Sequence, residues 1–384
     1  SLSHAISSLE SELGVKLFKK NGRNVTLTKY GKSFLTDAEG TAPDLAIEAP
    51  PQALSLTENP SAQPYAAVTL TAEKKGWQRQ VIQGIQIFPC QTTLATLEMI
   101  PVNESTPGRQ RVESVQIPPH PLYAGEGGSG PGPDPEDSPQ VLDQVIIPKN
   151  ITVHLGKPAA SARNVTVSFR KYIANVASSE VYPTWPEQAL RAKISLALNR
   201  IYTEWYPSKG YRFNITNSTS YDQYFVYGRT IFDVMERITD DIFNTYVRRS
   251  GTIEPYYTEY CDGKTVTCPG MKQWGTVTLA NQGRSALQIL RNYYGRSVEI
   301  VRTQNIQSIP SSYPGSPLRR GDSGTSVATI QRQLNRIAKD YPFFGTVSVD
   351  GSFGASTETL VKRFQKQFNL TQDGVIGRAT WYKI

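Results

Sequence analysis

The sequence contains few cysteines and no long apolar run. Three cysteines in 384 residues are too few for a small scaffold held together by disulfides. No stretch approaches the ~18–20 consecutive apolar residues of a membrane-spanning helix, so we expect no membrane span. Ser1 opens an amphipathic pattern in place of a signal peptide, so we expect that the chain is cut at its N-terminus.

Apolar and charged side chains are both sparse. Apolar residues make up 38% of the chain, below the ~45–50% of typical globular proteins, and charged residues make up 19%. With 29 Gly and 26 Pro, this composition predicts two or three domains separated by linkers. The net charge of +8 favours polyanionic surroundings such as nucleic acid, anionic lipid or a bacterial wall. Because the excess is spread out, it also fits a mildly basic soluble protein.

Residues 1–35 predict a helix followed by a small β-element. Leu2, Ile6, Leu9 and Leu13 share one helical face, and the runs VKLF and NVTLT flank an NGR turn. This string resembles a truncated LysR-type winged helix-turn-helix, reduced to its recognition helix and wing. Because the supporting helices of that domain are absent, we do not expect nucleic acid as a partner. A fusion or a gene-prediction artefact near residues 36–40 is our hypothesis for this start.

The next stretch alternates between linkers and strands. Residues 36–64 are linker-like, and residues 105–144 form a Gly/Pro-rich linker. Between them, residues 65–104 contain the strand-like runs AAVTLTA, RQVIQGIQIF and TLATLEMI. They resemble the later strands of small β-sandwich domains of bacterial surface proteins, so we predict a partial β-sandwich segment. Cys90 is expected there as a small buried apolar group.

The chain ends in a helical module at residues 318–384, after a linker at 306–317. The strings LRRGDSGTSVATIQRQLN, VDGSFGASTETLVKRFQKQFNL and DGVIGRATWYKI resemble the peptidoglycan-binding-like three-helix domain. The repeated Asp-Gly dipeptides read as turns that belong to the scaffold. The resemblance implies peptidoglycan as ligand, with Trp381 and Tyr382 as candidate contacts. Trp381 as a core residue is the alternative.

Residues 145–305 predict an α+β domain with a second resemblance. The strings VSFRKYIANVASSEVYPTWPEQALRA and KQWGTVTLANQGRSALQILRNYY look like the sporulation stage II protein D / amidase-enhancer (LytB-like) family, which cleaves or remodels wall glycan. The resemblance implies Glu180 as the catalytic residue. The residues expected to bind substrate are Tyr182, Trp185, Tyr260, Gln273 and Trp274.

A physical argument supports Glu180. The aromatic neighbours Tyr182 and Trp185 would remove water from its carboxyl, and desolvation raises the pKa of a carboxyl so that it can donate a proton. One glutamate that acts first as acid and then as base is sufficient for a lytic transglycosylase, because the 6-hydroxyl of the sugar closes an anhydro ring. The alternative is that Glu180 caps a helix end or pairs with Arg170 or Lys171.

Cys261 and Cys268 lie seven residues apart across a DGK turn. This spacing suits a disulfide, with free thiols or a metal as the alternatives. Zinc needs four ligands, and no histidine lies nearby in the sequence. We therefore expect no metal and no cofactor.

The sequence as a whole predicts an α+β multidomain protein that binds and remodels peptidoglycan. We expect lytic-transglycosylase-like cleavage linked to sporulation, in the cell wall, in the spore envelope or outside a bacterium, with other wall-remodelling enzymes as further partners. The first alternative is a non-catalytic wall-binding or spore-associated structural protein. It is motivated by a helix about four residues shorter than in relatives and by the altered cysteine loop. The second alternative is a fragment of a DNA-binding regulator.

Overall fold

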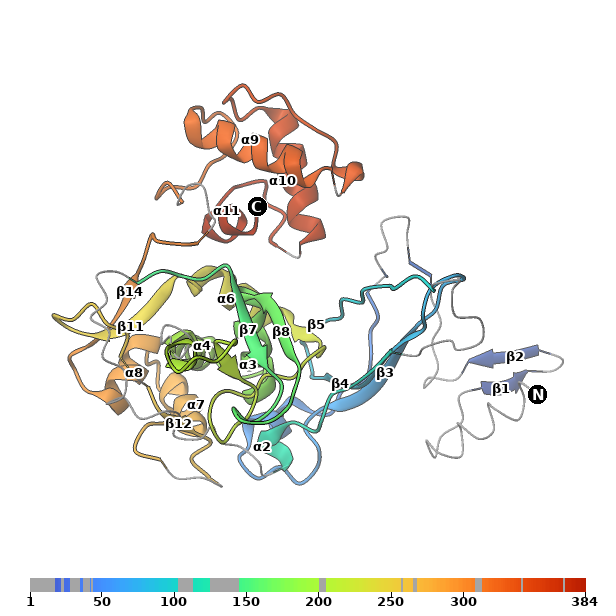
Figure 1. The fold of residues 1–384 in the computed structure, drawn as a ribbon. Coiled ribbons are helices and arrows are strands. Elements are labelled where there is room, and N and C mark those ends of the chain that lie inside the picture. The colour runs from blue at the N-terminus through green and yellow to red at the C-terminus, as the bar shows by residue number, and fades with distance from the viewer. Residues whose placement is uncertain are drawn as a thin grey trace. The chain divides into compact units, whose positions relative to one another are not determined.

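The computed structural model divides the chain into two compact units, Ser1–Ile47 and Glu48–Ile384 (Figure 1). The residues that it describes are 18–21, 24–27, 35–36, 42, 44–102, 113–124, 145–199, 205–256, 258–264, 268–307, 313–339, 341–368 and 370–384.

The described part of the first unit contains an antiparallel strand pair. β1 (Phe18–Asn21) pairs with β2 (Asn24–Leu27), with Phe18 opposite Leu27 and Asn21 opposite Asn24. The predicted β-element is thus confirmed for these residues. The expected recognition helix lies outside the described residues.

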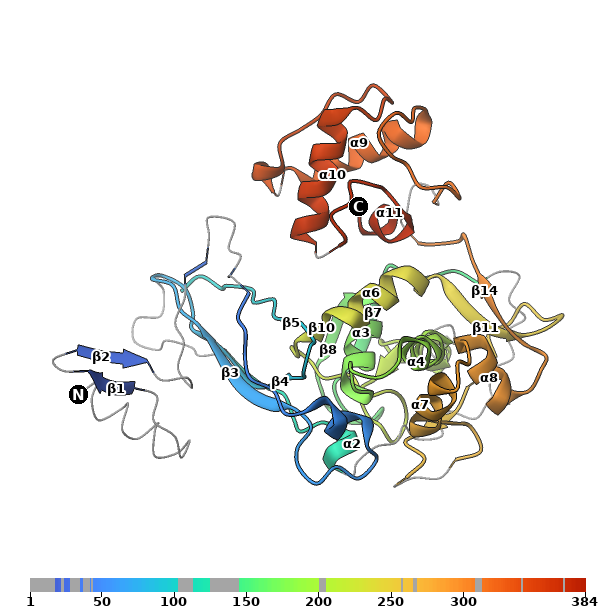
Figure 2. The same ribbon diagram turned by 180° about the vertical axis from the view of Figure 1, so that it is seen from behind.

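Three helices form the centre of the second unit (Figures 1 and 2). They are α3 (Phe169–Glu180), α4 (Glu187–Asn199) and α6 (Asp233–Ile242). The hydroxyl of Ser168 caps α3 by accepting a hydrogen bond from the backbone N–H of Lys171 at 3.3 Å. Every residue of α3 from Tyr172 onward is buried, so α3 is a central helix and not a surface helix with one apolar face.

Short sheets and further helices surround this centre. β7 (Asn150–His154) pairs antiparallel with β8 (Asn164–Ser168) and parallel with β9 (Ile215–Thr216). β11 (Thr245–Arg249) pairs antiparallel with β14 (Val298–Arg302), and β12 (Tyr260–Cys261) pairs parallel with β13 (Met271–Lys272). The remaining helices are α5 (Trp205–Ser208), α7 (Gln273–Asn281) and α8 (Ala286–Tyr294). This mixture confirms the predicted α+β character.

A three-stranded sheet precedes the central helices. Its strands, in spatial order, are β3 (Ala66–Ala72), β4 (Gln80–Ile87) and β6 (Glu113–Gln116). The short elements around it are η1 (Gln52–Leu56), β5 (Thr93–Leu94) and α2 (Pro121–Ala124). Strand β5 pairs with β10 (Ile231–Phe232), which immediately precedes α6. These backbone hydrogen bonds join the chain that follows β4 to the start of α6.

Two sequence predictions for this region are wrong. Strand β6 and helix α2 lie within residues 105–144, which we predicted as linker, and their chain packs inward because Leu122 joins the same core cluster as Phe88 and Tyr182. Cys90 is exposed rather than buried, because it lies in a turn after β4 with φ of +55°.

The C-terminal module contains three α-helices. They are α9 (Thr325–Ile337), α10 (Ala355–Gln367) and α11 (Arg378–Lys383), with the short 3-10 helix η4 (Pro342–Phe344) between the first two. Within the described part of the chain, no helix combines the length and the apolar character needed to cross a membrane.

One hydrogen-bond pattern, between a buried glutamine and an Asp-Gly turn, occurs twice in this module. The side chain of Gln331 donates to Asp350 at 2.8 Å and accepts from the N–H of Gly351 at 2.9 Å. The side chain of Gln365 makes the same pair of bonds to Asp373 and Gly374, both at 2.8 Å. The predicted Asp-Gly turns are therefore confirmed as scaffold, because a buried glutamine holds each of them.

Candidate functional site

Glu180, the predicted catalytic residue, is enclosed at the end of α3 and is 5% exposed. Its Oε2 forms an ion pair with Nζ of Lys193 at 2.5 Å. Its Oε1 accepts hydrogen bonds from the backbone N–H of Tyr224 at 2.8 Å and from the hydroxyl of Tyr260 at 3.2 Å. Both carboxylate oxygens are thus already in contact with protein groups.

Lys193 comes from the neighbouring helix α4 and is 1% exposed. Its Nζ also lies 3.1 Å from the centroid of the Tyr260 ring, which adds a cation–π contact. An isolated buried ion costs several kcal/mol of desolvation, so two buried charges of opposite sign stabilise each other only as a pair. The packing of α4 against α3 therefore supplies the counter-ion of Glu180.

The partners named in the alternative interpretation of Glu180 are not those that the structure shows. Lys193 and the residues around it cover the carboxylate. Arg170 pairs instead with Asp240 at 3.2 Å, and Lys171 is exposed. The catalytic role of Glu180 stays a prediction.

Lys193 was not among the predicted site residues, although the sequence pattern contains a signal for it. Lys193 stands in the run ALRAKISLALN, four residues after Ala189 and three before Leu196, and both of these are fully buried. A lysine on the buried face of a helix requires a buried acidic partner. The spacing alone did not identify Glu180 as that partner.

Two of the predicted substrate-binding residues lie in the interior. Tyr260 is 1% exposed, and its hydroxyl accepts a hydrogen bond from the side chain of Gln223 at 3.3 Å while donating to Glu180. Gln273 is 4% exposed at the start of α7, where its carbonyl accepts from the hydroxyl of Thr276 at 2.6 Å. In this structure Tyr260 orients Glu180 and offers no face to a sugar.

The three other predicted substrate-binding residues of this domain are also buried, at 0%, 3% and 4% exposed, and they meet in one cluster, which we call the aromatic floor: Tyr182, Trp185 and Trp274. The ring centroids of Trp185 and Trp274 are 4.8 Å apart, and that of Tyr182 lies 6.0 Å from Trp185 and 6.1 Å from Trp274. Burial raises the pKa of the Tyr182 phenol. The fold thus brings together rings from two stretches that are distant in the sequence.

A segment of the chain, residues 51–58, lies against the aromatic floor. We call it the cover. The hydroxyl of Thr184 donates to the hydroxyl of Ser55 at 2.8 Å, and the indole N–H of Trp185 donates to the backbone carbonyl of Ser55 at 3.1 Å. Nζ of Lys264 donates to the backbone carbonyl of Glu58 at 2.8 Å. We predicted this stretch as linker, and its contacts contradict that prediction.

Cys261 and Cys268 form a disulfide, with their Cα atoms 6.0 Å apart. The structure thus shows the disulfide, which the seven-residue spacing favoured. The bridge closes the loop that carries Lys264 toward the cover. In the described part of the chain, no group of three or more His, Cys, Asp or Glu side chains could hold a metal ion.

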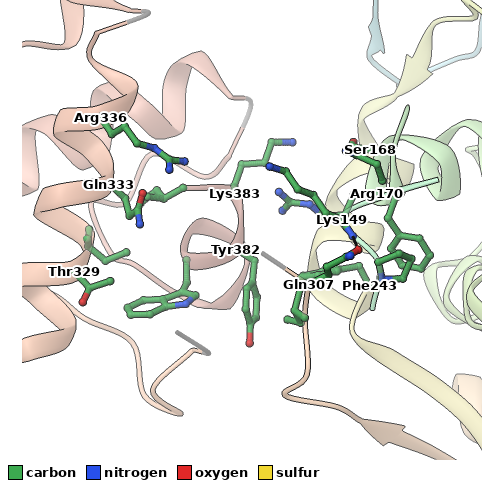
Figure 3. Close-up of a pocket in the computed structure, with 17 residues that line it drawn as sticks. Lys149, Ser168, Arg170, Phe243, Gln307, Thr329, Gln333, Arg336, Tyr382 and Lys383 are labelled. Atoms are coloured by element: carbon green, nitrogen blue, oxygen red, sulfur yellow. Dashed lines mark hydrogen bonds between the residues drawn. The ribbon is translucent and has the colours of Figure 1, made fainter. Parts of the chain in front are cut away.

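The candidate contacts in the C-terminal module are mostly buried. Trp381 is 6% and Tyr382 is 3% exposed, and the Tyr382 hydroxyl accepts a hydrogen bond from the backbone N–H of Tyr313 at 3.1 Å. Both line a cavity of about 250 Å³ (Figure 3). The polar side chains of α9 on this cavity are Thr329, Gln333 and Arg336. Trp381 therefore serves the core, as the alternative interpretation held, and also borders a cavity.

The two ends of the chain match known families. Residues 323–384 match the family described as "Putative peptidoglycan binding domain". Residues 1–32 match the family described as "Bacterial regulatory helix-turn-helix protein, lysR family".

Similar proteins overlap the chain in part. The chain is 41% identical over 68 residues to the zinc D-Ala-D-Ala carboxypeptidase of Streptomyces albus G, covering 17% of this chain and 25% of that protein. It is 32% identical over 81 residues to the N-acetylmuramoyl-L-alanine amidase CwlL of Bacillus licheniformis, covering 21% of this chain and 22% of that protein. The chain thus spans about a quarter of the length of these curated relatives.

Two solved structures are also similar. A peptidoglycan-binding protein from Clostridioides difficile in complex with glutamine hydroxamate is 31% identical, with a TM-score of 0.16, over 22% of this chain and 44% of that one. The SleB N-terminal domain is 35% identical, with a TM-score of 0.16, over 18% of this chain and 88% of that one.

Proposed function

We propose that this protein binds bacterial peptidoglycan through its C-terminal module, in the cell wall or outside the cell. The observation that carries the proposal is the family match of residues 323–384. Two relatives are named for wall components, D-Ala-D-Ala and N-acetylmuramoyl-L-alanine. The module also has the apolar core that a stable binding unit needs, since Val327, Leu334 and Phe364 are fully buried.

Sedimentation of the full chain with purified insoluble peptidoglycan tests this proposal. We expect the intact chain in the pellet, and we expect soluble wall fragments to release it. Replacing both Gln331 and Gln365 by alanine removes the two turn-holding devices and should abolish sedimentation. The matched control replaces the half-exposed Gln367 and the exposed Gln372, neither of which lines the cavity. An intact chain that stays in the supernatant would refute binding.

Cleavage of glycan strands is a second candidate function. The observation that favours it is the aromatic floor. Its rings Tyr182 and Trp185 come from the segment that directly follows Glu180, and Trp274 comes from the second stretch that resembles the stage II protein D family. Aromatic rings with a few polar groups suit the apolar faces of sugars. A link to sporulation and partnership with other wall-remodelling enzymes belong to this same proposal.

In the proposed reaction, the Glu180 carboxyl protonates the leaving glycosidic oxygen, and the resulting carboxylate then removes the proton of the 6-hydroxyl as the anhydro ring closes. The first step needs a proton on an oxygen that now faces Lys193 or accepts from Tyr224 and Tyr260. A sugar could therefore reach this carboxyl only after a local rearrangement, and binding without cleavage is the better-supported function.

Mass spectrometry of digested glycan separates the two candidates. Cleavage is supported if the intact chain releases glycan with anhydro ends and Glu180→Gln does not. A second variant that is destabilised as much as Glu180→Gln should still release them. Sedimentation without any released sugar would leave binding alone.

A further inference from the structure

The cover is largely exposed, and Ser55 is its buried residue. Ser55 is fully buried, whereas residues 51–53 and 56–59 are exposed. Of its two leucines, Leu54 is half-buried and Leu56 is 42% exposed. The segment is a single short 3-10 helix, η1, followed by the exposed residues 57–59. It is held to the domain by hydrogen bonds from Thr184, Trp185 and Lys264, and it buries little apolar area that would fix it permanently.

Ser55 offers two groups to the domain, a hydroxyl and an amide carbonyl. The hydroxyl accepts from Thr184, and the carbonyl accepts from the indole N–H of Trp185. An N-acetylated sugar carries the same two groups, ring hydroxyls and an acetamido carbonyl. Ser55 therefore occupies donors that could serve such a sugar.

The aromatic floor also contains donors that the cover does not use. The indole N–H of Trp274 and the hydroxyl of Tyr182 are buried and have no hydrogen-bond partner among the described residues. Buried polar groups without a partner are rare in folded proteins, and each needs an explanation. Together with the rings, they give the floor more hydrogen-bonding capacity than the cover satisfies.

We propose that residues 51–58 are an intramolecular cover over a binding site for N-acetylated sugars, and that release of the cover exposes the aromatic floor. The proposal rests on the second candidate function, because it takes the floor as a sugar site. It adds that the site is closed in the isolated chain and is opened by displacement of Ser55.

Binding of a soluble tetramer of N-acetylglucosamine to the full chain, measured by titration calorimetry, tests the cover. Ser55→Arg cannot fit into the fully buried position and should release the segment. Ser61→Arg, at an exposed position three residues beyond the cover, is the matched control with the same charge change. We expect Ser55→Arg to bind at least about tenfold more tightly than the wild type, because apparent affinity falls with the fraction of molecules that are open.

A second variant tests whether a gain in affinity of Ser55→Arg comes from opening the cover and not from misfolding. Replacing residues 52–58 by a Gly/Ser linker of equal length removes the cover without placing a charge in the core, and it should bind like Ser55→Arg. Thermal unfolding confirms that both variants are folded. Equal affinity in the wild type and the opened variants would refute the cover, and no binding in any folded variant would refute the sugar site.

This experiment is independent of wall anchoring. If the full chain does not sediment with insoluble wall but the opened variants still bind the tetramer more tightly, the anchor proposal fails and the cover stands. If the full chain sediments but the opened variants gain no affinity for the tetramer, the cover proposal fails and the anchor stands.

Discussion

Replacing Lys193 by methionine is expected to destabilise the protein strongly. Lys193 is 1% and Glu180 is 5% exposed, so removal of the ammonium leaves a carboxylate inside the protein with two hydrogen bonds and no counter-ion. Breaking a buried pair by removing one partner typically costs about 3–5 kcal/mol in the free energy of unfolding. At roughly 2 °C per kcal/mol for a unit of this size, the melting temperature should fall by about 6–10 °C.

A double-mutant cycle measures the pair directly. The free energies of unfolding of Glu180→Gln, Lys193→Met and the double variant come from urea denaturation followed by tryptophan fluorescence. We expect the double variant to lose less stability than the sum of the single variants, by about 2 kcal/mol or more, because it buries no unpaired charge. Lys171→Met, in the exposed first turn of α3, is the control and should change stability by less than about 0.5 kcal/mol.

A small effect would refute this reasoning. If Lys193→Met costs less than about 1 kcal/mol, the pair behaves like an exposed ion pair, and the enclosure of Glu180 is not as the structure shows. A large effect has a consequence for function, because loss of wall cleavage in Glu180→Gln alone would then not prove a catalytic role. Activity must be compared with Lys193→Met at a temperature where both variants are folded.

Three further predictions concern other parts of the chain. Burial and the nearby Arg229 hold the pKa of His120 well below its usual 6.5, so the unfolded chain takes up a proton near pH 6.5 while the native chain does not. The wild type should therefore lose stability relative to His120→Gln as the pH falls below about 6.5, by up to about 1.4 kcal/mol per pH unit, in urea titrations at pH 7.5 and 5.5. Replacing Cys261 and Cys268 by serine should lower the free energy of unfolding by about 2 kcal/mol, since the bridge closes a short loop, and a change below about 0.5 kcal/mol would contradict this. Gln331→Ala should cost the C-terminal module about 2–3 kcal/mol in calorimetry, because the buried side chain also bonds the carbonyl of Ser352 and the hydroxyl of Thr357, and an unchanged melting temperature would show that this device is dispensable.

The sequence determined those features whose physics is local. Asp-Gly dipeptides identified the turns of the C-terminal module, because few residues adopt that backbone, and two cysteines flanking a turn favoured the disulfide. The composition of residues 105–144 misled, because a Gly- and Pro-rich average concealed the short strand β6 and helix α2.

Only the tertiary structure decided the environment of the candidate site. Lys193 reaches Glu180 because two helices pack together, and Ser55 reaches Trp185 across 130 residues of sequence. No regular spacing in the sequence predicts either contact. Which distant residues meet depends on burial and charge neutralisation within the folded core. The sequence could therefore point to an acidic side chain next to aromatic rings. Its covered and paired state depended on which distant segments came to lie against it.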